Sequence, residues 1–193
     1  PADALLARLG DRDDVIPLAL HVDYWDYIGW KDRFAKPAFT RRQKGYAHAG
    51  GWRTIYTPQV VIDGTAAGVG SDMMGVLDMI RSAEATPAPV DLKIVRDGDM
   101  LRINLQPVNE DGVGPSDIWV VRYLDEDKVS IRRGENAGRT LTYTHIARDW
   151  SRLDAWDGRS SLSASTPLEG SEPAVVLVQG EDFGPIFAAA RLR

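Results

Sequence analysis

The sequence predicts an α/β domain followed by an antiparallel β-sandwich domain, and three observations lead to this expectation. Residues 1–83 show apolar helical faces and short β-branched runs in the order helix, strand, helix, strand, strand, helix. The segment EATPAPV, residues 84–90, holds two prolines and little large apolar content, which is typical of a linker. From residue 91 to residue 193 the pattern changes to about seven short runs with turn residues between them.

In the first domain, helices and strands are predicted from periodicity and from residues that start or stop a helix. Met74, Leu77 and Ile80 recur at helical spacing, so we expect them on one side of the third helix. The expected elements are a helix ending at Gly10, a buried strand within VIPLALHV (15–22), a helix opened by Pro37, strands at Val60–Ile62 and near AAGVG, and a helix capped by Ser71.

In the second domain, turn residues separate the predicted strands. LKIVRDGDMLRINLQ places two alternating runs around Asp97-Gly98, a pair that favours a β-hairpin. A second hairpin is expected from IWVVRYL and KVSIRR, with its turn at Asp125–Asp127. The runs TLTYTHIARDW, AVVLVQ and IFAAARL complete the predicted strands.

Composition narrows the classes of function. The formal net charge of -5 at pH 7 argues against nucleic acid or an anionic membrane as the main partner. No apolar run reaches the roughly 20 residues that a membrane-spanning helix needs. The chain has 0 cysteines, which excludes disulfides, thiolate metal sites and cysteine chemistry within these residues. We expect no cofactor.

Pro58 stands where a strand should begin, in the stretch IYTPQVVIDG. Because proline lacks an amide hydrogen, it can hold the first place of a strand but not the middle, so a trans proline at the strand start is one interpretation. Thr57-Pro58 and the order of elements also resemble the thioredoxin superfamily, in which the peptide bond before this proline is cis. The resemblance implies that Pro58 and Thr57 shape a peptide- or thiol-binding edge.

Four segments extend this resemblance to most of the chain: PADALLARL, HVDYWDYIGWKD, YTPQVVIDG and RGENAGRTLTYT. They resemble bacterial exported proteins of the "domain of unknown function 1223" family, whose members carry a Cys-x-x-Cys pair immediately before a Pro-Pro-Ala-Asp segment. Pro1-Ala2-Asp3 is similar to the end of that segment. The resemblance implies redox cysteines upstream of Pro1, protein or peptide thiols and disulfides as partners, and a periplasmic or secreted location. Residues 1–193 contain no signal peptide, but the chain opens on Pro1 rather than methionine. The start is therefore expected to be a boundary made by processing or by truncation of a longer protein, and it says nothing about export.

The lack of cysteine leaves two interpretations. In the first, these residues belong to a thiol–disulfide oxidoreductase whose dithiol lies just before Pro1, where the start of a helix favours a thiolate. A thioredoxin-like sheet that lacks a central strand would expose pairing groups, which favours this interpretation. In the second, the protein is a cysteine-free relative that binds an extended partner without reacting. In both, residues 1–193 alone are not redox-active, because exchange requires a thiol.

The segment HVDYWDYIGWKD, residues 21–32, is rich in aromatic and acidic residues. One interpretation is an aromatic loop that packs over the end of the sheet with its acids in solvent. The other is a binding surface at the carboxyl end of a strand, with Tyr24 and Trp25 as contacts and Asp23 or Asp26 as the polar anchor. The predicted substrate-binding residues are Thr57, Pro58, Tyr24, Trp25 and Asp26.

Three further patterns carry weaker signals. His21 and Asp23 share a face of the expected strand, but neither His48 nor His145 follows at metal-binding spacing, so we expect no metal. RRGENAGRT, residues 132–140, lacks the GxxxxGK[ST] pattern of a phosphate loop and predicts a glycine-supported turn.

Within that turn, Arg133, Glu135 or Arg139 is a candidate for reaching the interface between the domains. The role of RGENAGR is not predicted beyond this. The basic run Arg41–Lys44 predicts the solvent-exposed face of a helix.

Overall fold

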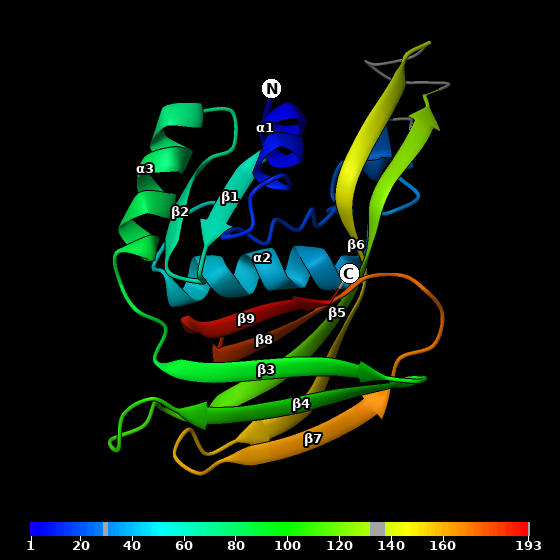
Figure 1. The fold of residues 1–193 in the computed structure, drawn as a ribbon. Coiled ribbons are helices and arrows are strands. Elements are labelled where there is room, and N and C mark those ends of the chain that lie inside the picture. Colours follow the sequence, from blue (N-terminus) through cyan, green and yellow to red (C-terminus); the bar gives the residue numbers. More distant parts are fainter. Residues whose placement is uncertain (29–30, 132–137, 193) are drawn as a thin grey trace.

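The computed structural model describes residues 1–28, 31–131 and 138–192, and it shows a mixed α/β protein with few helices and antiparallel sheets (Figure 1). In chain order the elements are α1 (Ala2–Leu9), η1 (Asp26–Ile28), α2 (Pro37–Ala49), β1 (Gln59–Ile62), β2 (Ala66–Val69), α3 (Met73–Glu84), β3 (Val90–Asp97), β4 (Met100–Pro107), β5 (Ser116–Ser130), β6 (Thr140–Trp156), β7 (Leu162–Pro167), β8 (Ala174–Gly180) and β9 (Ile186–Leu192). The sheets have the strand orders β1-β2, β3-β4-β7 and β6-β5-β8-β9. Among the described residues, no helix is long and apolar enough to cross a membrane.

The three helices begin and end close to the expected signals. Gly10 follows the last residue of α1, and Pro37 is the first residue of α2. The predicted cap of α3 is wrong by one residue: the carboxylate of Asp72, not Ser71, accepts a hydrogen bond from the Gly75 amide at 3.1 Å. A carboxylate at this position satisfies an otherwise unpaired amide of the first turn.

Helices α1 and α3 cover the β1–β2 hairpin with apolar side chains. Leu5 and Leu9 of α1 and Val76 and Ile80 of α3 form one buried cluster, against which Val60 and Ile62 pack. The prediction for α3 is wrong for one residue, because Met74 is exposed and the buried face centres on Val76. A helical period of 3.6 places residues 76 and 80 on the same buried face of α3. Residues 73 and 74 belong to the first turn of the helix, where both side chains are exposed.

The expected strand at residues 15–22 does not form as a regular strand. Ala19 makes a single parallel bridge with Ile146, through hydrogen bonds from the Ala19 amide to His145 (2.7 Å) and from the Ala147 amide to Ala19 (2.9 Å). The apolar run nevertheless packs against a buried cluster, to which Ile16, Leu18 and Leu20 contribute. The apolar run therefore correctly predicts that the segment is buried. A regular strand also requires a neighbouring strand aligned along its length, which this segment lacks.

The predicted second hairpin is one continuous strand. Residues 125–127 lie inside β5, which pairs with β8 only over Ser116–Arg122 and with β6 along its whole length. Beyond Arg122 the two strands leave the larger sheet and continue as a two-stranded arm that rises beside α1 (Figure 1). An acidic run is compatible with a strand here because Asp125 and Glu126 are exposed in the arm.

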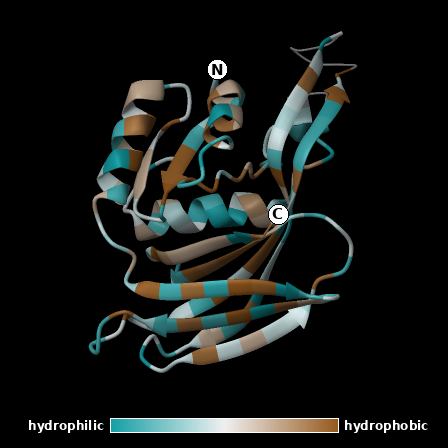
Figure 2. Cartoon of the chain, in the orientation of Figure 1, coloured by the Kyte–Doolittle hydropathy of each residue, from teal (hydrophilic) through white to brown (hydrophobic). Residues whose placement is uncertain are grey.

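The two larger sheets share one hydrophobic core. Leu101 and Ile103 of β4 meet Ile118 of β5 and Val176 and Val178 of β8, all fully buried. The hairpin predicted around Asp97-Gly98 is confirmed, and apolar and polar residues alternate along β3 and β4 (Figure 2). Strand β8 is buried at every residue because α2 covers its other face, where Phe39 and Val175 share a second cluster.

Candidate functional site

Thr57 and Pro58 form an exposed corner immediately before β1. The peptide bond between them is cis, as the resemblance implied. The Pro58 carbonyl accepts a hydrogen bond from the Gly70 amide at 2.9 Å, which extends the β1–β2 pairing by one position. A proline can hold this place because its missing amide hydrogen leaves no donor unpaired.

The other edge of β1 has unused backbone groups. Backbone groups in a strand alternate in direction, so those of Gln59 and Val61 point away from β2, opposite to those of Pro58. Farther along this edge, the Asp63 carbonyl accepts from the Ile186 amide at 2.8 Å. Within the described part of the chain, the backbone groups of Thr57 and the outward groups of Gln59 and Val61 have no backbone partner.

The aromatic loop contacts this corner directly. The indole nitrogen of Trp25 donates to the Thr57 hydroxyl at 2.8 Å. The Tyr24 hydroxyl donates to Gln43 at 3.1 Å, and Gln43 in turn donates to the Gln59 side chain at 2.7 Å. Burial raises the pKa of Tyr24, although hydrogen bonds with Gln43 and Thr57 oppose the rise. Tyr24, Trp25, Thr57 and Pro58 therefore lie at one site.

Asp26, the fifth predicted residue, does not contact Thr57 or Pro58 through its carboxylate. Its Oδ1 atom accepts from the amide of Asp32 at 3.1 Å, so it stabilises the loop from within. Asp23 turns toward α2, where its carboxylate accepts from the Thr40 hydroxyl at 2.5 Å. The alternative anchor is thus also engaged in holding the loop.

A histidine–aspartate pair closes the base of the loop. The Nδ1 atom of His21 lies 2.5 Å from Oδ2 of Asp32, whose Oδ1 accepts from the Phe34 amide at 2.9 Å. Burial acts to raise the pKa of Asp32, but the hydrogen bonds from His21 and Phe34 outweigh it and the pKa is lowered. The ring of His21 packs against Phe34 and against Tyr143 of the arm. Sequence reasoning missed this pair because its members lie at opposite ends of the loop.

The first turn of α1 lies beside Pro58. A side-chain carbon placed on Gly70 would stand 3.2 Å from Cβ of Pro58 and 3.5 Å from Cβ of Ala2. The start of α1 and the corner before β1 therefore border the same glycine. Asp3, in the same turn, contributes with Asp32 to the raised pKa of Tyr143, whose main cause is burial.

The prediction that the basic run in α2 faces solvent is confirmed for Arg41 and Lys44 and is wrong for Arg42. Arg42 is 5% exposed, and its guanidinium donates to Gln179 at 2.9 Å and to the Tyr46 hydroxyl at 3.0 Å. It also lies 3.9 Å from the centre of the Trp150 ring. Gln43 is half-buried and supports the site. The burial of Arg42 could have been predicted from the sequence, because Arg42 recurs at helical spacing with the aromatic residues Phe39 and Tyr46.

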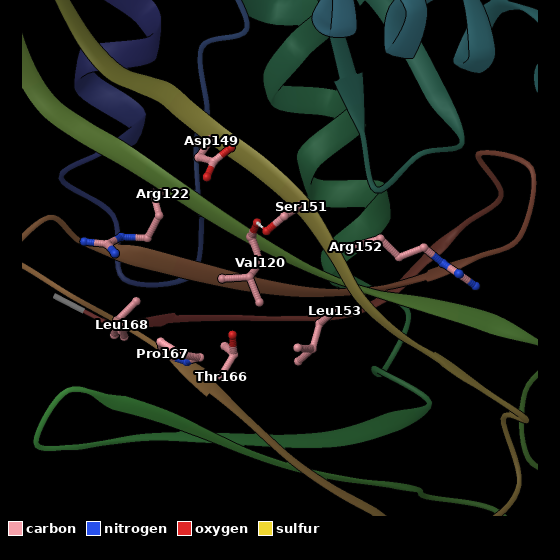
Figure 3. A pocket seen from close by; sticks show the side chains of 9 residues that line it. All are labelled: Val120, Arg122, Asp149, Ser151, Arg152, Leu153, Thr166, Pro167 and Leu168. Carbon is pink, nitrogen blue, oxygen red and sulfur yellow. Dashed lines mark hydrogen bonds between the residues drawn. The ribbon is translucent and has the colours of Figure 1, made fainter.

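A separate hollow of about 210 Å³ lies in the second half, between β5, β6 and β7 (Figure 3). The guanidinium groups of Arg122 and Arg152 point in opposite directions, away from the middle of the lining residues (Figure 3). Arg152 is paired with Asp117 at 2.7 Å, and Arg122 donates to the Glu172 carbonyl at 2.9 Å. Because both arginines have protein partners, the hollow is a weaker candidate for a ligand site than the corner at Pro58.

Two further sequence predictions concern metal ligands and the segment at residues 132–140. Among residues 1–28, 31–131 and 138–192, no group of three or more His, Asp or Glu side chains could hold a metal ion. Arg133 and Glu135 lie outside the described residues. Arg139 is exposed, and its carbonyl accepts a hydrogen bond from the Ile131 amide at 2.8 Å.

Together these features define a mixed α/β protein with an aromatic loop over an open strand edge. The chain belongs to the family described as "Protein of unknown function (DUF1223)", whose model matches residues 1–179. Among solved structures it is similar to protein AGR_C_4864 from Agrobacterium tumefaciens, with 28% identity and a TM-score of 0.84, over 100% of this chain and 86% of that one. It also resembles HBP35 of Porphyromonas gingivalis in fold alone, with 13% identity and a TM-score of 0.51, over 81% of this chain and 58% of that one. No curated protein matches.

Proposed function

We propose that residues 1–193 are the substrate-binding part of an exported, thioredoxin-like thiol–disulfide oxidoreductase. In this proposal the first half is a thioredoxin-like domain and the second half is a β-sandwich that helps to position the partner. The observation that carries the proposal is the position of α1. Ala2 and Pro58 border the same glycine, Gly70, so a dithiol placed just before Pro1 would lie beside the Thr57–Pro58 corner.

The chemistry of such a site follows from the start of α1. Backbone amides and the helix dipole favour a thiolate there. That thiolate attacks one sulfur of the partner's disulfide; the partner's S–S bond breaks, its second sulfur leaves as a thiolate, and a mixed disulfide forms. The thiolate of the second cysteine then attacks the sulfur of the first, which releases the partner's remaining thiolate and leaves a disulfide in this protein. Residues 1–193 contribute binding and orientation of the partner.

The open edge of β1 supports a further strand before Pro1. The outward groups of Gln59 and Val61 have no backbone partner among the described residues, and both residues are half-buried. Unpaired backbone groups in such a position are costly unless a strand, a side chain or water satisfies them. A strand that leads into the dithiol would satisfy them.

Expression from the complete reading frame tests the oxidoreductase. We expect a Cys-x-x-Cys pair within a few residues before Pro1, preceded by a strand and a signal peptide. The full protein should then reduce a model disulfide, and its variant with both cysteines replaced by serine should not. Equal rates for the two proteins would contradict the proposal. Fractionation of the native host tests export, and recovery in the cytoplasm would contradict that part.

A second candidate is a binding protein that performs no redox chemistry. It is favoured by the exposed Thr57 edge together with the 0 cysteines of these residues. An extended segment can add to such an edge through main-chain hydrogen bonds. Binding of an extended peptide by residues 1–193, with a complete reading frame free of cysteine, would support this candidate over the first.

A further inference from the structure

Exposed apolar side chains gather around Pro58. We call this set the Pro58 surface; its members are Trp25 (45% exposed), Tyr27 (81%), Val69 (47%), Met73 (41%) and Met74 (62%). The other large apolar residues that are exposed in the described chain, Val95, Met100 and Val108, all belong to the second half. A gathering of large apolar side chains in one region is typical of an interaction site, whereas scattered ones need no explanation.

Contacts place these side chains on two sides of the Thr57–Pro58 corner. On one side, Trp25 bonds to Thr57 and stacks against Tyr27, with ring centres 6.5 Å apart. On the other side, Val69 is the strand partner of Gln59, and its carbonyl accepts from the Asp72 amide at 2.9 Å. Asp72 leads directly into the exposed methionines at the start of α3.

The occupant of this surface should be extended. Thr57 is exposed, and its backbone groups have no backbone partner in the described chain. Alternate side chains of a strand point to opposite faces, so one extended segment paired at Thr57 can reach both apolar sides. Methionine side chains adapt to different apolar partners, which suits a surface that accepts more than one sequence.

Charge further defines the occupant. Each of the three elements around the corner carries an aspartate next to its surface residues: Asp3 in α1, Asp26 in the aromatic loop and Asp72 before α3. These three acids outnumber two exposed cations of the neighbouring segments, Lys31 in the loop and Arg53 before Thr57. A surface of this sign attracts a cationic partner.

We propose that the Pro58 surface binds an extended polypeptide segment with large apolar side chains on both of its faces and a net positive charge. The inference rests on the proposed function, because it names the class of partner for the same Thr57 edge. The apolar side chains provide most of the contact, and the aspartates select by charge and accelerate association.

A set of labelled ten-residue peptides tests the inference with residues 1–193, by fluorescence anisotropy at low salt. The first peptide has Leu and Phe at alternate positions with lysines between them, the second has glutamates in place of lysines, and the third has serines in place of Leu and Phe. We expect the first to bind at least tenfold more tightly than either of the others. Its affinity should fall as salt is added, because the charges are screened.

Matched variants locate the binding. Met74→Gln and Tyr27→Ser should each weaken the first peptide about three- to tenfold, whereas Met100→Gln and Val108→Ser, which remove exposed apolar side chains from the second half, should not change it. Asp72→Asn keeps a capping oxygen for Gly75 but removes the charge, so it should reduce the salt dependence. Glu110→Gln is the charge control.

The outcomes separate the inference from the function on which it rests. Equal affinity for all three peptides would overturn the inference about apolar side chains and charge, but it would leave peptide binding by this chain in place. Absence of binding by every peptide would overturn both the inference and the binding function of this chain. Disulfide reduction by the complete protein is measured separately, so the oxidoreductase proposal does not depend on the peptide result.

Discussion

Arg42 of α2 and Gln179 of β8 are both almost fully buried, and a 2.9 Å hydrogen bond joins them. Within the described residues Arg42 has no salt-bridge partner; its guanidinium instead lies over the rings of Trp119 and Trp150. Burial lowers the pKa of Arg42 below its ordinary value. The contact joins the first half of the chain, through α2, to the sheet of the second half, and it positions the helix that carries Gln43 to the site.

Replacing Arg42 with methionine should destabilise the fold. The change removes the hydrogen bonds that Arg42 donates to the side-chain oxygen of Gln179 and to the Tyr46 hydroxyl. The Gln179 amide nitrogen still donates to Tyr46 and to the Gly184 carbonyl, so the loss should cost roughly 2–4 kcal/mol in total. Urea denaturation should show a lower midpoint with an unchanged slope. Arg41→Met, one residue away and exposed, should stay within about 0.5 kcal/mol of the native protein. Equal midpoints for the two variants would mean that the buried contact contributes nothing.

The hydrogen bond between Trp25 and Thr57 should couple the aromatic loop to the corner before β1. Trp25→Phe removes the donor and Thr57→Val removes the acceptor. In a double-mutant cycle we expect a coupling energy of about 0.5–1 kcal/mol, because the bond is partly exposed. Hydrogen exchange should be faster in the loop of each single variant. The control is a cycle between Tyr27→Phe and Thr57→Val, because no hydrogen bond is found between Tyr27 and Thr57 in the described chain. A coupling energy in this control as large as that between Trp25 and Thr57 would contradict the prediction.

Asp32 should make stability depend on pH in the acid range. Its pKa in the folded protein is lowered from the ordinary 3.8, so the unfolded chain binds more protons in this range. The stabilisation is fully present above about pH 4 and is lost as the pH falls through the folded pKa. Asp32→Asn should therefore be less stable than the native protein at pH 6, and this difference should shrink toward pH 3.

The measurement is urea denaturation between pH 3 and pH 6 in steps of about half a unit, compared through linkage. Glu110→Gln provides a control for loss of one carboxylate from an exposed connection. A stability difference between Asp32→Asn and the native protein that stayed constant over the whole range would show that the carboxylate of Asp32 is not preferentially stabilised in the fold.

A side chain at Gly70 should disturb the corner at Pro58. The added carbon would stand 3.2 Å from Cβ of Pro58 and 3.3 Å from Val60, closer than ordinary packing allows. We expect Gly70→Ala to cost about 1–2 kcal/mol, as overpacking in a filled site does. Gly114→Ala is the matched control, because no heavy atom lies within 4 Å of its added carbon. If thermal denaturation showed the same loss for both variants, the crowding at Gly70 would not be its cause.

The elements with local signals could be predicted from the sequence. Pro37 and Gly10 mark a helix start and a helix end, and Asp97-Gly98 marks a hairpin turn, because the chemistry of each acts on neighbouring residues. Among the predicted strands and turns, those at residues 15–22 and 125–127 were wrong. Residues 15–22 form an apolar run without an aligned neighbouring strand. Residues 125–127 are acidic residues of the kind found in turns, but they lie in the long arm formed by β5 and β6.

The same division applies to the candidate site. Tyr24 and Trp25 were predicted from an aromatic segment, whereas Thr57 and Pro58 were predicted from a resemblance carried by the threonine–proline pair. Their side chains lie at one site. Arg42 was misjudged because a charged residue is normally exposed, and only surrounding aromatic rings from distant strands make its burial tolerable.

By itself the sequence determined where the backbone can start, stop and turn, since proline and glycine act within a few residues. It also determined which runs of the chain must be buried. Only the tertiary structure decided what the buried and exposed groups meet: Asp32 meets His21 across a loop, Arg42 meets Gln179 from 137 positions away, and the start of α1 meets Pro58. The physical reason is that hydrogen bonding and packing depend on distance in space, whereas sequence patterns report only neighbours along the chain.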